Sequence, residues 1–225
     1  RIKLSPKSLL LTIRNIGYMI KLGTSAFISE ASIACMMFLG NYVFIRHLGE
    51  DGVAAFSIVC YFFPIIFMVY NAIAQSAQPI ISYNFGADLP IRVRETLYLS
   101  IRTALLCGIC FFAITALCSQ YIAALFIDRS YAAFEIAEKG IPYFAIGYIF
   151  FAFNMVGIGY YQSIERARRA TIITLLRGVI FMLIGFFALP PFLGVPGIWL
   201  AVPLAELLTT IYIIGVYLKD HRIKK

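Results

Sequence analysis

The chain is a succession of long apolar runs separated by short polar segments. Six runs fall near residues 22–45, 53–81, 99–122, 140–161, 170–189 and 196–218. A helix needs roughly 20 apolar residues to cross the ~30 Å hydrocarbon layer of a bilayer. Lipid offers no hydrogen bonds to the backbone, so each run is predicted to be a membrane-spanning helix. Six spans place both ends of the chain on one side.

The first run carries a charge that its apolar pattern does not explain. Glu30 lies about a third of the way along it, and no basic residue lies within one helical turn. A charge at this depth costs at least about 2.5 to 3.5 kcal/mol on insertion scales, so an intramembrane acid indicates an ion or substrate pathway. At helical spacing, Glu30 shares a face with Phe27, Met37 and Asn41.

Two further runs carry polar stripes at helical spacing. Met68, Asn71 and Gln75 share one face of the second run, and Phe150 and Asn154 share one face of the fourth. Amides and aromatic rings on inward faces suit a cavity for bulky, partly apolar molecules. The predicted cavity residues are Phe27, Met37, Asn41, Met68, Asn71, Gln75, Phe150 and Asn154. Alternatively, such amides hydrogen-bond between helices, each contributing about 0.6 kcal/mol.

Arg177 in the fifth run and Glu206 in the sixth are predicted to form a structural ion pair. The short, proline-rich connection between these runs implies antiparallel helices. At about 1.5 Å per residue, Arg177 lies roughly 12 Å deep and Glu206 roughly 18 Å deep, a gap that an arginine side chain can close. Paired charges are the form in which a helix bundle in lipid tolerates them.

Composition agrees with a membrane protein. Hydrophobic residues make up 61% of the chain and charged residues 13%, against about 25% charged in a typical soluble protein. Of the 19 Lys and Arg residues, 16 flank one face of the predicted bundle. By the positive-inside rule this face, with both chain ends, is cytoplasmic. Because the basic residues are spread over four separate stretches, the net charge of +8 does not indicate nucleic-acid binding.

Catalytic and metal chemistry find little support in the sequence. His47 and His221 lie in a predicted loop and a tail, so they assemble no Ser/His dyad and no His-ligated metal site. Cys107 and Cys110 form a CxxC without further ligands, and we interpret the five cysteines as packing residues. No phosphate-binding glycine loop of the Walker type is present. We expect no enzyme activity, no metal and no cofactor.

Three segments resemble a known family. QPIISYNFGA at residues 78–87, followed by Arg92 and Arg94, resembles the junction after the second helix of each lobe in the multidrug and toxic compound extrusion (MATE) transporters. GIWLAVPLAELLT at residues 197–209 and Leu175, Leu176 and Arg177 resemble the same family. The resemblance runs along essentially the whole chain, with matching helix order and loop lengths.

The resemblance implies a fold and a domain organisation. Family members have twelve helices in two six-helix lobes around a central cavity, and this chain is similar to the second lobe. Residues 1–21 would be the cytoplasmic link between lobes, 22–218 the six-helix bundle and 219–225 a basic cytoplasmic tail. The partner would then be a missing N-terminal lobe, which agrees with a chain that opens on Arg1 instead of Met.

The resemblance also implies a function. Family members work in a membrane, here a bacterial inner membrane, and exchange sodium ions or protons for organic cations or other amphipathic drugs. In one branch a glutamate in the first helix of the second lobe joins an aspartate in the fourth helix to form a cation site. Glu30 matches the first position. Residues 140–161 contain no acid, and Asn154 is the nearest polar substitute.

Two alternatives stay open at this stage. A lipid-linked oligosaccharide flippase has related architecture, but it would place several cationic side chains in its cavity, and the inward stripes here carry none. A homodimeric six-helix channel or scaffold would fit a natural chain of 225 residues, whereas a gene product of twice that length would exclude it.

Overall fold

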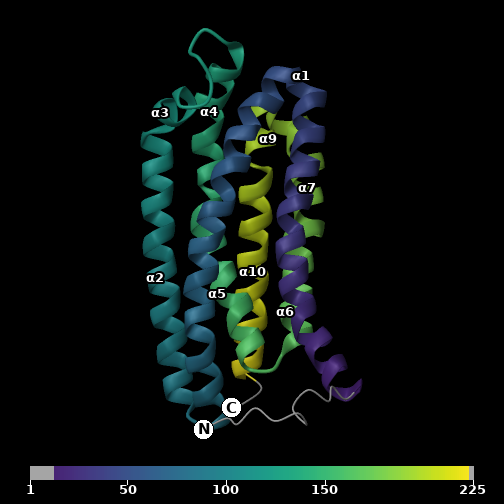
Figure 1. Ribbon diagram of the computed structural model, residues 1–225, viewed down its shortest axis with the longest axis vertical. Coiled ribbons are helices and arrows are strands. Elements are labelled where there is room, and N and C mark those ends of the chain that lie inside the picture. The colour runs from purple at the N-terminus through teal and green to yellow at the C-terminus, as the bar shows by residue number, and fades with distance from the viewer. Residues whose placement is uncertain (1–12, 223–225) are drawn as a thin grey trace, which may run out of the picture.

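A computed structural model describes residues 13–222, and every regular element within them is a helix. The helices lie side by side along the long axis of the molecule (Figure 1). The start of the first helix and the end of the last lie at the same end of this bundle. Residues 1–12 of the predicted link and 223–225 of the predicted tail lie outside the described residues.

Helix α1 (Ile13–Gly86) contains the first two predicted spans in one element. It folds back at Gly49, whose φ of 66° and ψ of −156° break the helix. Glycine adopts a positive φ at little cost, so the reversal needs no loop. The two resulting arms, residues 13–48 and 50–86, lie antiparallel (Figure 1).

The next four helices follow the second arm of α1 along the chain. They are α2 (Pro90–Leu117), α3 (Ser119–Ala124), α4 (Ala132–Ala145) and α5 (Gly147–Ser163). α4 and α5 together bend by 41° at their junction. The fourth predicted span therefore begins earlier, at Ala132, and is bent near its middle.

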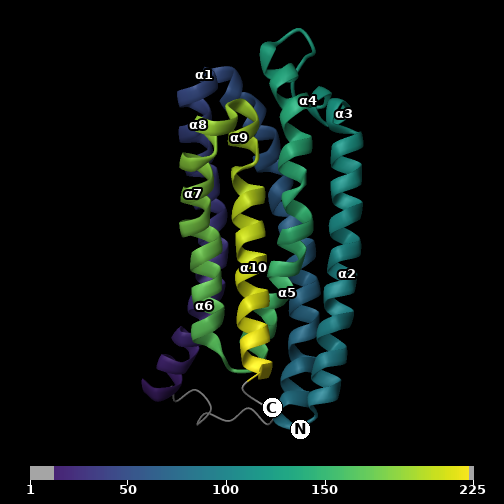
Figure 2. The same cartoon turned by 180° about the vertical axis from the view of Figure 1, so that it is seen from behind.

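The last two predicted spans comprise a broken helix and a continuous one. The fifth consists of α6 (Ala167–Leu175), the π-helical segment η2 (Leu176–Ile180) and α7 (Phe181–Ala188). Short helices α8 (Pro190–Leu193) and α9 (Val195–Trp199) turn the chain, and α10 (Ala201–Arg222) returns along the bundle (Figure 2). A π-helical turn inside an α-helix is frequent at functional sites.

The described residues contain four helices that are long and apolar enough to cross a membrane, and the bent pair of α4 and α5 makes a fifth. One of the four, Phe27–Gly86, has 60 residues, far more than one crossing needs. Its reversal at Gly49 divides it into two arms. The predicted class, an all-α membrane protein, is confirmed.

Helix α5 lies in the middle of the bundle and packs against both α1 and α2 as well as α10. Aromatic rings fill the contact with the second arm of α1. Phe151 stacks on Phe63 with ring centroids 5.0 Å apart, and Tyr70 meets the same ring edge-on at 5.3 Å. This core fixes the rotation of α5, and therefore decides which of its side chains reach each neighbouring cavity.

Candidate functional site

A polar cavity of about 260 Å³ lies between the two arms of α1 and helix α5. Its wall carries one carboxylate, four amide or hydroxyl groups from α1, and one amide from α5. The lining residues are Ser29, Glu30, Asn71, Ala74, Gln75, Gln78, Met155, Ile158, Gly159 and Gln162. Glu30 of the first predicted span and Asn71 and Gln75 of the second therefore line the same cavity.

Glu30 is the acid of this cavity. Its side chain is exposed, and it has no ion pair or hydrogen bond with any residue that the structure describes. The second arm of α1 places Asn71 and Gln75 in the same lining. The carboxylate is therefore accessible to a ligand and is surrounded by neutral groups that can accept or donate hydrogen bonds.

The floor of the cavity is closed by side chains that join α1 to α5. The Gln78 side-chain amide donates a hydrogen bond to Gln162 Oε1 at 2.8 Å. One turn further along α1, the Ser82 hydroxyl donates to the Ser163 carbonyl at 3.1 Å. Gln162 was not among the cavity residues predicted from the sequence. The signal that could have identified it is its amide side chain directly after the apolar run 140–161.

The other predicted cavity residues of α1 lie on the same helix faces but outside this lining. Phe27 and Met68 are 72% and 69% exposed. Met37 and Asn41 lie further along the first arm and are partly buried. Asn41 Oδ1 is buried without a hydrogen-bond partner in the described part of the chain.

Behind the cavity wall lies a buried charged network. Arg177 in η2 and Glu206 in α10 form an ion pair with 3.5 Å between Nη1 and Oε1, and both side chains are almost completely buried. Arg177 Nη2 also donates to the Ser32 hydroxyl at 3.2 Å, and its guanidinium lies over the ring of Phe151 at 4.8 Å. Burial at this depth keeps the pair away from the cavity.

Asn154 belongs to this network, which corrects its prediction as a cavity residue. Its amide nitrogen donates to Glu206 Oε2 at 2.7 Å and to the Glu206 carbonyl at 2.8 Å. Its own oxygen accepts a hydrogen bond from Thr210 at 2.9 Å. The buried carboxylate of Glu206 needs donors, and Asn154 supplies one, so the side chain turns inward.

Phe150 is partly buried and does not line the cavity either. The face of α5 that reaches the cavity is instead formed by Met155, Ile158, Gly159 and Gln162. Met155 links the two regions, because it lines the cavity and its sulfur accepts a 3.6 Å hydrogen bond from Arg177 Nη1. Met155 therefore contacts both the cavity and the buried pair.

A family model described as MatE matches residues 8–193. The chain belongs to the MatE family. No curated protein gives a significant match to the sequence. The MatE assignment places the cavity, the buried pair and the break in η2 inside a family of multi-pass membrane proteins.

Solved structures show the same fold. A MOP superfamily transporter from Pyrococcus furiosus, described as having a binding pocket of reverse polarity that suggests a different function, matches with a TM-score of 0.88 and 16% identity over 100% of this chain. An outward-facing multidrug resistance MATE family transporter matches with a TM-score of 0.86 and 17% identity over 99% of this chain. The Vibrio cholerae MATE transporter VcmN, solved as a mutant, matches with a TM-score of 0.86 and 15% identity over 98% of this chain.

In each case the match covers about half of the solved chain: 51%, 50% and 50%. This chain therefore has the fold of one lobe of a two-lobe MATE transporter.

Proposed function

We propose that this chain is the second lobe of a secondary antiporter that exports organic cations or amphipathic drugs in exchange for sodium ions or protons. The observation that carries the proposal is the unpaired Glu30 carboxylate in a polar cavity between α1 and α5. An acid in a membrane span is costly, and a cation or proton that binds to it offsets that cost.

The lining favours cationic ligands. Glu30 is the charged group among the ten residues that line the cavity, and the remaining polar groups are neutral amides and a hydroxyl. A coupling cation and a cationic drug would compete for the same carboxylate, so binding of one would release the other. In alternating access, two bundles rock around such a site near the middle of the bilayer.

A flippase for anionic lipid precursors would need basic residues at this place, and none lies in the lining of the described cavity. Arg177, which contacts Met155 of the cavity wall, is paired with Glu206. This arrangement favours an antiporter for cations over a flippase.

The proposal includes a location and a partner. The protein would lie in a bacterial inner membrane with both ends of this lobe on the cytoplasmic side, because most basic residues flank that face. An N-terminal lobe would complete the central cavity. The coupling acid of the lobe would be Glu30 alone, because Asn154 takes the place of a second acid in the fourth span and is bonded to Glu206.

The test is Glu30→Gln in the whole transporter, measured as ethidium efflux from loaded cells under an imposed sodium or proton gradient. We expect at least a tenfold loss of gradient-driven efflux. Glu50→Gln is the matched control, because Glu50 is an exposed acid at the α1 reversal, far from the cavity. Unchanged, gradient-dependent efflux in Glu30→Gln would remove Glu30 from the coupling mechanism.

A further inference from the structure

A second cavity lies on the opposite face of α5. Helices α2 and α10 both pack on α5 (Figure 2), and their backbones approach each other at few positions. Two adjoining pockets, here called the crevice, are lined by residues of all three helices. Phe153, Gly157 and Tyr160 of α5 form its floor. These positions point away from Met155 and Gln162, so α5 separates this crevice from the cavity that contains Glu30.

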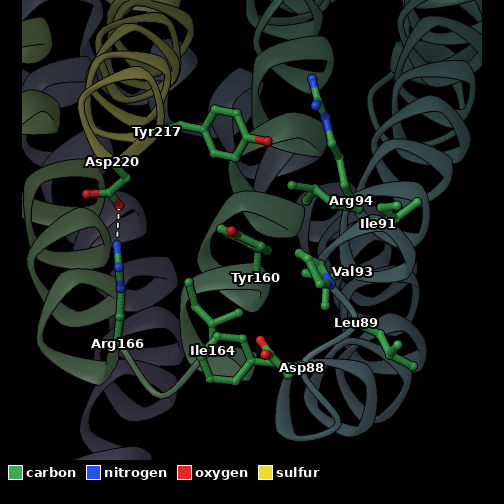
Figure 3. A pocket seen from close by; sticks show the side chains of 13 residues that line it. Asp88, Leu89, Ile91, Val93, Arg94, Tyr160, Ile164, Arg166, Tyr217 and Asp220 are labelled. Atoms are coloured by element: carbon green, nitrogen blue, oxygen red, sulfur yellow. Dashed lines mark hydrogen bonds and ion pairs between the residues drawn. The ribbon is translucent and has the colours of Figure 1, made fainter. Parts of the chain in front are cut away.

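The crevice is polar at its open end. A cavity of about 280 Å³ lies near the end of the bundle where α1 passes into α2 (Figure 3). Its lining includes Asp88, Arg94, Tyr160, Arg166 and Tyr217. Figure 3 shows Asp88 at the edge of this cavity, with Arg94 extending from α2 along the helix and the Tyr217 hydroxyl directed toward the side of α2.

Further along the bundle, away from the α1–α2 junction, the crevice becomes apolar. A groove of about 190 Å³ continues from the polar cavity, and its exposed lining contains no polar surface. Leu97, Tyr160 and Tyr217 line both parts. The groove is then formed by apolar side chains of all three helices, namely Ile101, Phe153, Ile213 and Ile214.

The Arg94 side chain has hydrogen-bond donors that are available to a ligand. Its Nε donates to the Tyr98 hydroxyl at 3.0 Å, and the guanidinium lies 5.3 Å from the centre of the Tyr98 ring. No hydrogen bond or ion pair joins its two Nη groups to a described residue. Arginine prefers phosphate and carboxylate as partners and can bind either with two parallel hydrogen bonds.

Asp88 is also unpaired. Its carboxylate has no ion pair or hydrogen bond with the described residues. Asp220, the other acid of the lining, is neutralised by ion pairs with Arg166 and Arg169. The open end of the crevice therefore offers a ligand the unpaired carboxylate of Asp88 and the two Nη groups of Arg94.

We propose that this crevice binds one glycerophospholipid with a primary amine in its head group. From the end of the bundle inward, the structure presents an unpaired carboxylate, a guanidinium whose Nη groups are available, two tyrosines and an apolar groove. Phosphatidylethanolamine presents an amine, a phosphate, a glycerol backbone and acyl chains in the same order. Asp88 would bind the amine, Arg94 the phosphate, and the groove between α2 and α10 one acyl chain.

The ligand is assigned by the charges of Asp88 and Arg94 and by the apolar groove that continues from them. A lipid without the amine, such as phosphatidylglycerol, leaves Asp88 unpaired beside an anionic head group. A water-soluble phosphate leaves the groove unfilled. This site lies outside the cavity of the proposed transport function and does not depend on it.

The experiment is a titration of the delipidated whole protein in detergent with dioleoylphosphatidylethanolamine, followed by native mass spectrometry and thermal unfolding. We expect one bound lipid, with at least fivefold weaker binding of dioleoylphosphatidylglycerol. Inorganic phosphate and glycerophosphoethanolamine should bind at least a hundredfold more weakly, because they do not fill the groove. If either soluble compound binds as tightly as the lipid, the site is not a phospholipid site.

Matched variants test each part of the site. Arg94→Gln should weaken binding of both lipids about tenfold, whereas Arg92→Gln, an exposed neighbour outside the lining, should not. Asp88→Asn should weaken only the amine-bearing lipid, and asparagine tolerates the positive φ of 53° at this position. Equal effects of Arg94→Gln and Arg92→Gln would overturn the proposal.

The groove is tested by filling it. Ile214 lines the groove and is 43% exposed, so Ile214→Trp should block the acyl chain and prevent binding. Ile211 lies on the same helix outside the groove and is 58% exposed, so Ile211→Trp is the control and should bind normally. Normal lipid binding in Ile214→Trp would show that the chain does not lie there.

Discussion

Gly178 in η2 packs so closely against Ser32 in the first arm of α1 that no side chain fits between them. A Cβ atom added to Gly178 would lie 2.3 Å from Ser32 Cβ. The same approach brings the neighbouring Arg177 within 3.2 Å of the Ser32 hydroxyl. The π-helical segment and its glycine together place a charged side chain in the core.

Gly178→Ala is therefore expected to destabilise the protein. Neither Cβ atom can rotate away, so one helix must move, and overpacking of this kind costs about 1 to 3 kcal/mol. The measurement is thermal unfolding of the purified protein in detergent. Gly215→Ala in α10 is the control, because no atom lies within 4 Å of its added Cβ. Equal melting temperatures for the two variants would refute the expectation.

Because Arg177 and Glu206 form a buried ion pair, the effects of their substitutions on stability should be strongly non-additive. Arg177→Met or Glu206→Met alone leaves an unpaired buried charge, which costs about 3 to 5 kcal/mol. The double variant removes both charges, so its loss in the free energy of unfolding should be smaller than that of either single variant. A double-mutant cycle in detergent measures this coupling. As a control, Arg166→Met breaks an ion pair with Asp220 at a side chain that is 37% exposed, and it should cost less than about 1 kcal/mol.

Asn154→Asp should not create a second acid in the cavity, because Asn154 lies in the core beside Glu206. The change replaces the donor to Glu206 Oε2 by a carboxylate, so two acids would face each other in the core. We expect a loss of at least about 2 kcal/mol in stability, because a buried hydrogen bond is lost and like charges repel. Asn71→Asp, in the cavity lining, is the comparison and should be tolerated. A stable Asn154→Asp protein that binds sodium more tightly would contradict this.

The orientation of the lobe is tested by cysteine labelling in a background without native cysteines. Glu50 lies at the reversal of α1 and Glu165 lies between α5 and α6, at opposite ends of the bundle. The positive-inside rule places Glu165 in the cytoplasm. Glu50→Cys should react with an impermeant maleimide in intact cells, and Glu165→Cys only after permeabilisation. The reverse pattern would invert the proposed topology.

Much of the fold was predictable because its signals are strong and local. Apolar runs of this length have few alternatives to membrane helices, and the placement of Arg177 opposite Glu206 followed from helix length and a short connection. The break in the fifth span at η2 was not predicted, although Leu176–Ile180 contains Arg177 and Gly178 within an otherwise apolar run. In the fourth span, Pro142 is the sequence feature that indicates a bend, and the helix bends four residues further on, at Ile146.

The rotation of α5 was the main obstacle at the site. Helix α5 is apolar on all sides, and most of its side chains are buried, so its polar residues do not reveal which face meets the cavity. Asn154 was the strongest polar group on the helix, yet tertiary contacts with Glu206 and Thr210 took it into the core. On α1 the polar residues stand out from a mostly apolar helix. Glu30, Asn71 and Gln75, which were predicted to face inward, line one cavity.

The reversal of α1 at Gly49 has a consequence for biogenesis. Because no loop separates the two arms, we expect them to enter the bilayer together as a hairpin. Asn71 and Gln75 of the second arm would then lie beside Glu30 of the first before the rest of the lobe is made. Insertion in this order would reduce the exposure of the Glu30 carboxylate to lipid.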